Sequence, residues 1–197
     1  NYKSWNNAVA LKLSLKYSIA VSDMLHFLQI ERGRSVGFLS KVVTKDDLAK
    51  NRADSDQRVQ IVEAIFHDLP STFIESNKNL LAKVQDARKL VDESKPGPEF
   101  VKLYSSIIEN FIDLQVDRAK SYPANGIEAY LISMSSLETA KEAMGRLRAL
   151  GTSLLATKKP FPPESKESLI GFRASVLSNV ESPALLASED THKQLDE

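Results

Sequence analysis

The chain has 197 residues, which is enough for one large domain or two small ones with a buried core. Lysine and arginine together number 26, as do aspartate and glutamate, and no basic run predicts a nucleic-acid partner. Cysteine is absent, which excludes disulfides and thiol catalysis. No apolar run predicts a membrane span or a signal peptide, and the first residue is asparagine. We therefore interpret the sequence as a soluble domain cut from a longer protein.

Apolar residues at helical spacing predict seven helices and no strand. The first helix is expected from about Trp5 to Val43. Thr44 is expected to cap the second helix, and Pro70 to end it. The third helix is expected to be capped by Ser71 or Thr72 and to end at Lys95–Pro98. Four more helices are expected from about Phe100 to Tyr122, from about Ile127 to Thr157, from about Glu164 to Val180, and from Pro183 to Glu197.

This pattern predicts an all-α fold of elongated up-down helical bundles. The turn-forming segment at 122–126 divides it into a first helical part, 1–122, and a second part, 123–197. In the long fifth helix, seven residues are expected to face inward: Tyr130, Leu137, Ala140, Met144, Leu147, Gly151 and Leu154. If both ends of the domain are anchored in the same membrane, an up-down bundle should have an even number of helices. Because seven helices are predicted, we expect that a last helix is missing from the sequence.

The first predicted helix has an arginine on its apolar face. Arg32 lies between Leu28 and Val36 on a stripe of leucine and valine. Because burial of an unpaired charge is costly, the Arg32 guanidinium needs a partner, either a carboxylate of the same protein or an anion from outside. Ser35 follows three residues later, near the same face, and can donate a further hydrogen bond.

Two further arginines have comparable positions. Arg52 lies between Leu48 and Ser55 on the second predicted helix, and Arg148 lies at the edge of the inward stripe of the fifth, beside small residues. The planar guanidinium matches a small oxyanion with two hydrogen bonds and stays charged at physiological pH. The residues alone leave two interpretations open: internal ion pairs with aspartate or glutamate, or a binding site for a small anion.

Enzyme chemistry and metal binding have little support in the sequence. The three histidines, His26, His67 and His192, are too few for a di-iron bundle, which needs two Glu-x-x-His pairs and two more glutamates. The Gly-Arg-Ser-Val-Gly segment at 33–37 lacks the Lys-Ser/Thr ending of a phosphate-binding loop and follows no strand. We expect no enzyme activity, no metal and no cofactor.

One segment resembles the signature of a known family. Residues 28–39, LQIERGRSVGFL, are similar to the first-helix pattern of NIT domains, the nitrate- and nitrite-sensing modules of bacterial signalling proteins. Three further segments resemble family segments in the same order: 51–56 (NRADSD), 103–108 (LYSSII) and 141–149 (KEAMGRLRA). Leu147 stands where the family usually has glutamate, which puts the ligand preference of this chain in question.

The resemblance implies two stacked helical bundles that share long helices, in a periplasmic or extracellular part of an inner-membrane protein. It implies a nitrate or nitrite ion held by arginines, with Arg32 and Arg148 at the motif positions. In the parent receptor we expect a homodimer, and contact with the membrane only through flanking segments absent from this sequence. The output domain of the parent protein could belong to a chemotaxis receptor, a histidine kinase, a diguanylate cyclase or an RNA-binding antiterminator.

Two functions from different classes follow. The first is a sensor domain that binds a small anion and transmits its occupancy by helix shifts of ~1–2 Å. Its expected ligand residues are Arg32, Arg148, Ser35 and Arg52. The alternative is a helical protein-interaction or structural module in which the arginines form internal salt bridges and bind no small molecule.

Overall fold

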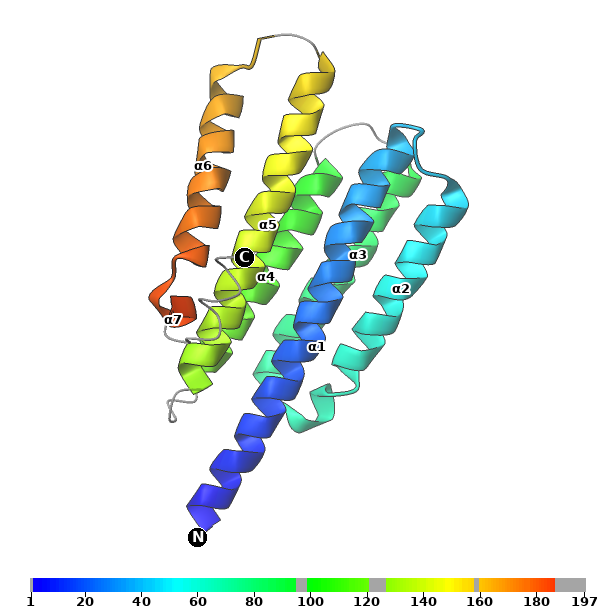
Figure 1. Ribbon diagram of the computed structural model, residues 1–197. Helices are drawn as coiled ribbons and strands as arrows, with labels where there is room; N and C mark the ends of the chain where they lie inside the picture. The colour runs from blue at the N-terminus through cyan, green and yellow to red at the C-terminus, as the bar shows by residue number, and fades with distance from the viewer. Residues whose placement is uncertain (1, 95–98, 121–126, 158–159, 187–197) are drawn as a thin grey trace. The chain divides into compact units, whose positions relative to one another are not determined.

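The computed structural model describes residues 2–94, 99–120, 127–157 and 160–186. Within these ranges the chain is helical and contains no strand, which confirms the all-α prediction. The elements are α1 (Tyr2–Leu39), α2 (Lys45–Glu63), a 3-10 turn η1 (Phe66–Asp68), α3 (Ser71–Asp92), α4 (Glu99–Lys120), α5 (Ile127–Thr157), α6 (Pro163–Val180) and α7 (Pro183–Leu186) (Figure 1).

Two compact units divide the chain, residues 1–114 and residues 115–197. The first contains α1 to α3 and most of α4, and the second contains the end of α4 with α5, α6 and α7. The breaker predicted at 95–98, the division predicted at 122–126 and the end of the seventh predicted helix all lie outside the described residues. No helix over the described ranges combines the length and the apolar character that crossing a membrane requires.

The turn after α1 explains why this helix ends before Val43, where the sequence pattern placed its end. Lys41 has a φ of 60°, a left-handed conformation that stops a right-handed helix. The N–H groups of Val42 and Val43 then both donate to the carbonyl of Gly37, at 2.9 and 3.2 Å. A Cβ on Gly37 would lie 2.5 Å from a Val43 methyl group, so this approach requires glycine. The turn directs α2 back along α1 (Figure 1).

One of the two predicted caps is present. The Thr44 side chain accepts a hydrogen bond from the backbone N–H of Asp47 at 3.1 Å and caps α2, as predicted. The expected cap of α3 by Ser71 or Thr72 is wrong, because Pro70 occupies the cap position and no side chain accepts a hydrogen bond there. The segment predicted as one helix up to Pro70 also divides into α2 and the shorter η1.

Apolar side chains of α1 to α4 form the core of the first unit. Tyr17 on α1 is fully buried, and its hydroxyl donates to Asn77 on α3 at 2.7 Å. Its ring meets Phe73 edge-on, with the ring centroids 5.1 Å apart. Large side chains of this core include Val21, Met24, Leu25, Leu28, Val62, Ile65, Val84, Phe100, Tyr104, Ile107, Ile108 and Phe111. The apolar stripe predicted for α4 therefore faces the core, whereas the stripe predicted for α1 is buried at Val21, Leu25 and Leu28 but exposed at Val36.

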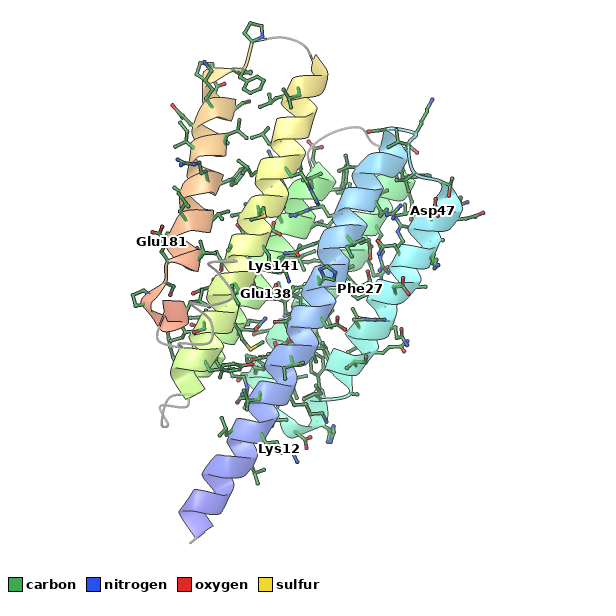
Figure 2. The ribbon with its side chains drawn as sticks, viewed as in Figure 1. Lys12, Phe27, Asp47, Glu138, Lys141 and Glu181 are labelled. Carbon is green, nitrogen blue, oxygen red and sulfur yellow. The ribbon has the colours of Figure 1, made fainter. Side chains whose placement is uncertain are left out.

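In the second unit, α5 and α6 pack as an antiparallel pair (Figure 1). The predicted bounds of both helices agree with the structure. The predicted inward face of α5 is partly wrong, because three of its large members are exposed: Tyr130, Leu137 and Met144. Ser135 and Glu138 are buried instead. Their polar groups are satisfied locally, since Ser135 donates to the Leu131 carbonyl and Glu138 accepts from Lys141 at 3.1 Å (Figure 2).

Candidate functional site

Two consecutive residues of α1, Glu31 and Arg32, are both buried in the first unit. Their exposed fractions are 0% and 6%. Successive side chains of an α-helix point about 100° apart, so these two meet different neighbours. The burial of Arg32 was predicted from the apolar stripe and is confirmed, whereas the burial of Glu31 was not predicted.

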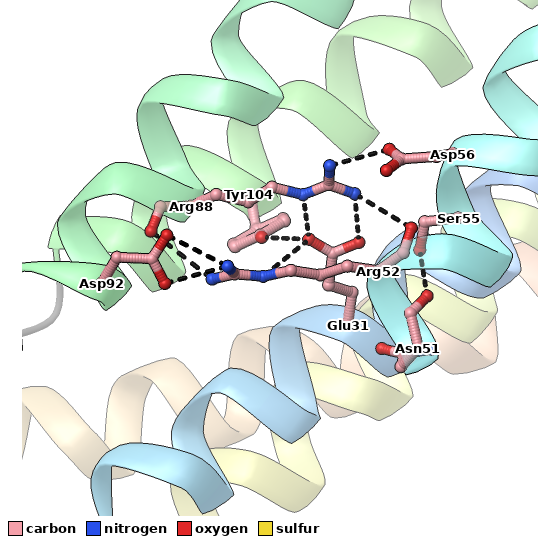
Figure 3. Close-up of polar contacts among 8 residues, drawn as sticks. All are labelled: Glu31, Asn51, Arg52, Ser55, Asp56, Arg88, Asp92 and Tyr104. Atoms are coloured by element: carbon pink, nitrogen blue, oxygen red, sulfur yellow. Dashed lines mark hydrogen bonds and ion pairs between the residues drawn. The ribbon is translucent and has the colours of Figure 1, made fainter. Parts of the chain in front are cut away.

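The Glu31 carboxylate is held by donors from two other helices. Nε and Nη2 of Arg88 on α3 donate to its two oxygens at 2.7 and 2.9 Å, and the Tyr104 hydroxyl on α4 donates at 2.6 Å (Figure 3). The remaining terminal nitrogen of Arg88 donates to Asp56 on α2 at 2.7 Å. This bidentate, charge-assisted geometry is the one in which a buried ion pair is best satisfied.

The pKa shifts in this cluster favour fixed charges. Burial would raise the pKa of Glu31, but the hydrogen bonds and charge of Arg88, with the Tyr104 hydrogen bond, lower it below its ordinary value. Burial would lower the pKa of Arg88, but Glu31 and Asp56 raise it. Burial and the Glu31 charge both raise the pKa of Tyr104. Glu31 and Arg88 thus stay charged and Tyr104 stays neutral near neutral pH, which is typical of a structural ion pair.

Arg52 belongs to the same cluster. Its Nη1 donates to both carboxylate oxygens of Asp92 at 2.9 and 3.1 Å, and its Nε lies 4.0 Å from Glu31 (Figure 3). The cluster therefore contains three carboxylates but only two guanidinium groups. The carboxylates belong to Glu31, Asp56 and Asp92, and the guanidinium groups to Arg52 and Arg88. An added anion would meet net negative charge here. The geometry of Arg52 favours the internal ion pair over the predicted role as a ligand.

Arg32 points to a different neighbour. Its Nη1 donates to the hydroxyl of Ser105 on α4 at 2.7 Å, in the buried interior of the unit. Ser35, one turn after Arg32 on α1, is fully buried, and its hydroxyl has no hydrogen-bond partner among the described residues. One guanidinium and two hydroxyls thus belong to the interior of the first unit, and all three can donate hydrogen bonds to an oxyanion.

Arg148, the second motif arginine, belongs to α5 in the second unit and has an exposed side chain. The expectation of a buried arginine therefore holds for Arg32 but not for Arg148. The buried side of α5 carries Glu142 instead, which is 3% exposed and accepts from Arg146 at 2.9 Å. Leu147, at the position of the usual family glutamate, is half-buried. The role of Arg148 as a ligand stays a prediction.

Sequence reasoning missed the residues that organise this part of α1, namely Arg88, Tyr104 and Ser105. Arg88 had a detectable signal, because it lies between Val84 and Val91 on the apolar stripe of α3, as Arg32 does on α1. Tyr104 and Ser105 lie in the segment 103–108 that resembles the NIT family, but without an assigned role. Over the described residues, no group of three or more acidic or histidine side chains could hold a metal ion.

Comparisons with known proteins bear on the family and on the fold. The NIT family model, described as "Nitrate and nitrite sensing", matches residues 23–197. The solved "Structure of the NasR transcription antiterminator" is similar with a TM-score of 0.77 at 20% sequence identity, which supports the fold alone. The match covers 92% of this chain and 54% of that one, so the chain spans about half the length of that protein. A comparison with curated proteins gave no match.

The family match extends over most of the chain and includes both motif arginines, Arg32 and Arg148. The family is one of sensing domains rather than of enzymes, and the all-α fold agrees with the solved NasR structure. The chain belongs to the NIT family of nitrate- and nitrite-sensing domains.

Proposed function

We propose that this NIT domain binds a small planar oxyanion, nitrate or nitrite, and that Arg32 is its principal ligand. The observation that carries the proposal is the position of Arg32 in the family motif, with a buried guanidinium that contacts a neutral hydroxyl at 2.7 Å. Arginine suits such an anion because its fork of donors matches two oxygens of a trigonal ion. Ser35 adds a neutral donor, and Arg148 is proposed as a second charged ligand.

Nitrate titration of four proteins tests this assignment: wild type, Arg32→Ala, Arg148→Ala and Arg34→Ala. Arg34 is the matched control, because it lies on α1 two residues from Arg32 but is exposed. Nitrate at a hundred times its dissociation constant should stabilise the wild type by ~2.7 kcal/mol, which is a rise of about 5–10 °C in melting temperature. Arg32→Ala and Arg148→Ala should lose the shift, and Arg34→Ala should keep it.

The competing function, a structural or interaction module without a small ligand, gives the opposite results. Its arginines would serve only as internal partners, as Arg52 does for Asp92. Wild type would then ignore nitrate and nitrite at millimolar concentration. If an internal carboxylate pairs with Arg32, removal of Arg32 would lower stability by ~3–5 kcal/mol, because that carboxylate would be left buried without its partner.

For the parent protein we propose an extracytoplasmic sensor, joined through flanking membrane segments to a signalling output and assembled as a homodimer. The family supports a sensing role, and signalling by ~1–2 Å helix shifts suits long helices such as α1. The likeness to the NasR antiterminator favours a second candidate, a regulator of transcription without a membrane anchor. Protease accessibility of the full-length protein in spheroplasts separates the two, and light scattering of the purified protein tests the dimer.

A further inference from the structure

Two serines close to Arg32 in the chain or in space, Ser35 and Ser105, are buried in the first unit. Buried serines in helices commonly satisfy their hydroxyl proton by donating to the carbonyl four residues earlier. Three buried serines of this chain do so at 3.0–3.1 Å, namely Ser14, Ser55 and Ser135, whereas the buried hydroxyl of Ser22 has no partner among the described residues. Among the described residues, Ser35 makes no such bond, and the hydroxyl of Ser105 only accepts, from Arg32. Both serines therefore have a hydroxyl proton that no described acceptor takes.

An uncommitted hydroxyl proton in the interior is costly, because burial removes the water that would otherwise accept it. An anion bound beside Arg32 would supply the missing acceptor. A hydroxyl has one proton and two lone pairs, so Ser105 can accept from the Arg32 Nη1 and donate at the same time. Accepting a bond from a cation also polarises the O–H group and strengthens it as a donor.

We propose that Ser105 is a ligand-contacting residue of the anion site, which donates its hydroxyl proton to the oxyanion while its oxygen orients the Arg32 guanidinium. Ser35 is the second neutral donor, from the turn of α1 that follows Arg32. This inference rests on the proposed function and adds to it a residue of α4. The neighbouring Glu31 carboxylate accepts from Arg88 and Tyr104, and no described hydrogen bond joins it to Ser35 or Ser105.

The test compares Ser105→Ala, Ser105→Thr and the matched control Ser106→Ala. Ser106 is the next residue of α4 but is exposed, and its hydroxyl accepts from Asn110 at 3.3 Å. Calorimetric titration with sodium nitrate should give a dissociation constant about 10- to 100-fold weaker for Ser105→Ala, as expected for a lost bond to a charged group. Ser105→Thr, which keeps the hydroxyl, should bind within a few-fold of wild type, and Ser106→Ala should match wild type.

Ligand-free melting of each variant separates binding from folding. Ser105→Ala should melt below wild type, because the buried Arg32 Nη1 loses its acceptor, whereas Ser105→Thr should melt close to wild type. Unchanged nitrate affinity in Ser105→Ala, with binding lost in Arg32→Ala, overturns the role of Ser105 and leaves the proposed function standing. Equal loss of binding in Ser105→Ala and Ser105→Thr, with lowered melting temperatures in both, also overturns it and indicates a packing role. A wild type that binds neither nitrate nor nitrite overturns both proposals.

Discussion

Replacement of Arg88 by methionine tests the buried ion pair that holds α1 in the first unit. The substitution keeps a long side chain but removes both donors to Glu31, whose side chain is fully buried, and the donor to Asp56. Tyr104 would still donate to the stranded carboxylate. Loss of one partner of a buried pair costs ~3–5 kcal/mol. A typical domain has a total stability of about 5–15 kcal/mol, so the variant should be strongly destabilised.

Arg52→Met is the matched control for this experiment. Arg52 belongs to the same cluster, but its partner Asp92 has a side chain that is 58% exposed, and its Nε lies 4.0 Å from Glu31. Solvent screens such a pair, so its removal should cost only about 0–1 kcal/mol. Urea unfolding measures the loss of stability in both variants, provided that the slope of unfolding free energy against urea concentration is the same as in the wild type. A loss for Arg88→Met no larger than that for Arg52→Met would refute the view that the buried carboxylate depends on Arg88.

The double variant Glu31→Gln, Arg88→Met isolates the coupling between the two residues. Since a neutral amide replaces the stranded charge, the double variant should be more stable than Arg88→Met alone. The coupling energy from the four-protein cycle should be about 1–3 kcal/mol. Purely additive losses would mean that the two groups do not stabilise each other in solution.

The same variants make a prediction about pH. In the wild type the pKa of Glu31 is lowered, so the stability it contributes is present above its unfolded value of about 4.3 and is lost as the pH falls through the folded value. Without Arg88, burial dominates and should raise this pKa above the unfolded value, so that stability is lost as the pH rises. The destabilisation caused by Arg88→Met should therefore grow between pH 4 and pH 7. Urea melts at several pH values check this, and a constant difference would contradict it.

Two further predictions concern the turn between α1 and α2. Gly37→Ala should lower stability by ~1–3 kcal/mol, because the new Cβ would lie 2.5 Å from a Val43 methyl group. Gly171→Ala, where no atom lies within 4 Å, should leave stability unchanged or raise it by up to ~1 kcal/mol in the same thermal melts. Thr44→Ala should cost ~1 kcal/mol by removing the bond to the Asp47 N–H, and equal urea midpoints for this variant and wild type would contradict the cap.

Local rules predicted the helices and one buried charge well. The bounds of α5 and α6 and the Thr44 cap follow from spacing and capping residues, which act within a few residues of each other. The burial of Arg32 followed from its place on an apolar stripe. The end of α1 was harder to predict, because the left-handed Lys41 and the close approach to Gly37 depend on how the chain turns in space.

The contacts around Arg32 could not be predicted, because their partners are distant in the chain. Arg88 is 57 residues from Glu31, and Ser105 is 73 residues from Arg32. Spacing shows that a buried charge needs a partner but does not identify it. The inward face of α5 was misjudged for a related reason. The spacing of apolar residues predicts only which apolar side chains face inward. Glu138 is charged but buried, because its charge is paired with Lys141 one turn away, and this spacing therefore could not detect it.

The register of α1 against α4 follows from two adjacent bonds. Glu31 meets Tyr104 at 2.6 Å and Arg32 meets Ser105 at 2.7 Å, so consecutive residues of one helix contact consecutive residues of the other. A slide of one helical turn, ~5.4 Å, would separate both pairs beyond hydrogen-bonding distance. The Glu31 bond is costly to break because the carboxylate is buried. A ligand-driven shift of α1 by ~1–2 Å can therefore keep this bond, whereas a slide by a whole turn would break it.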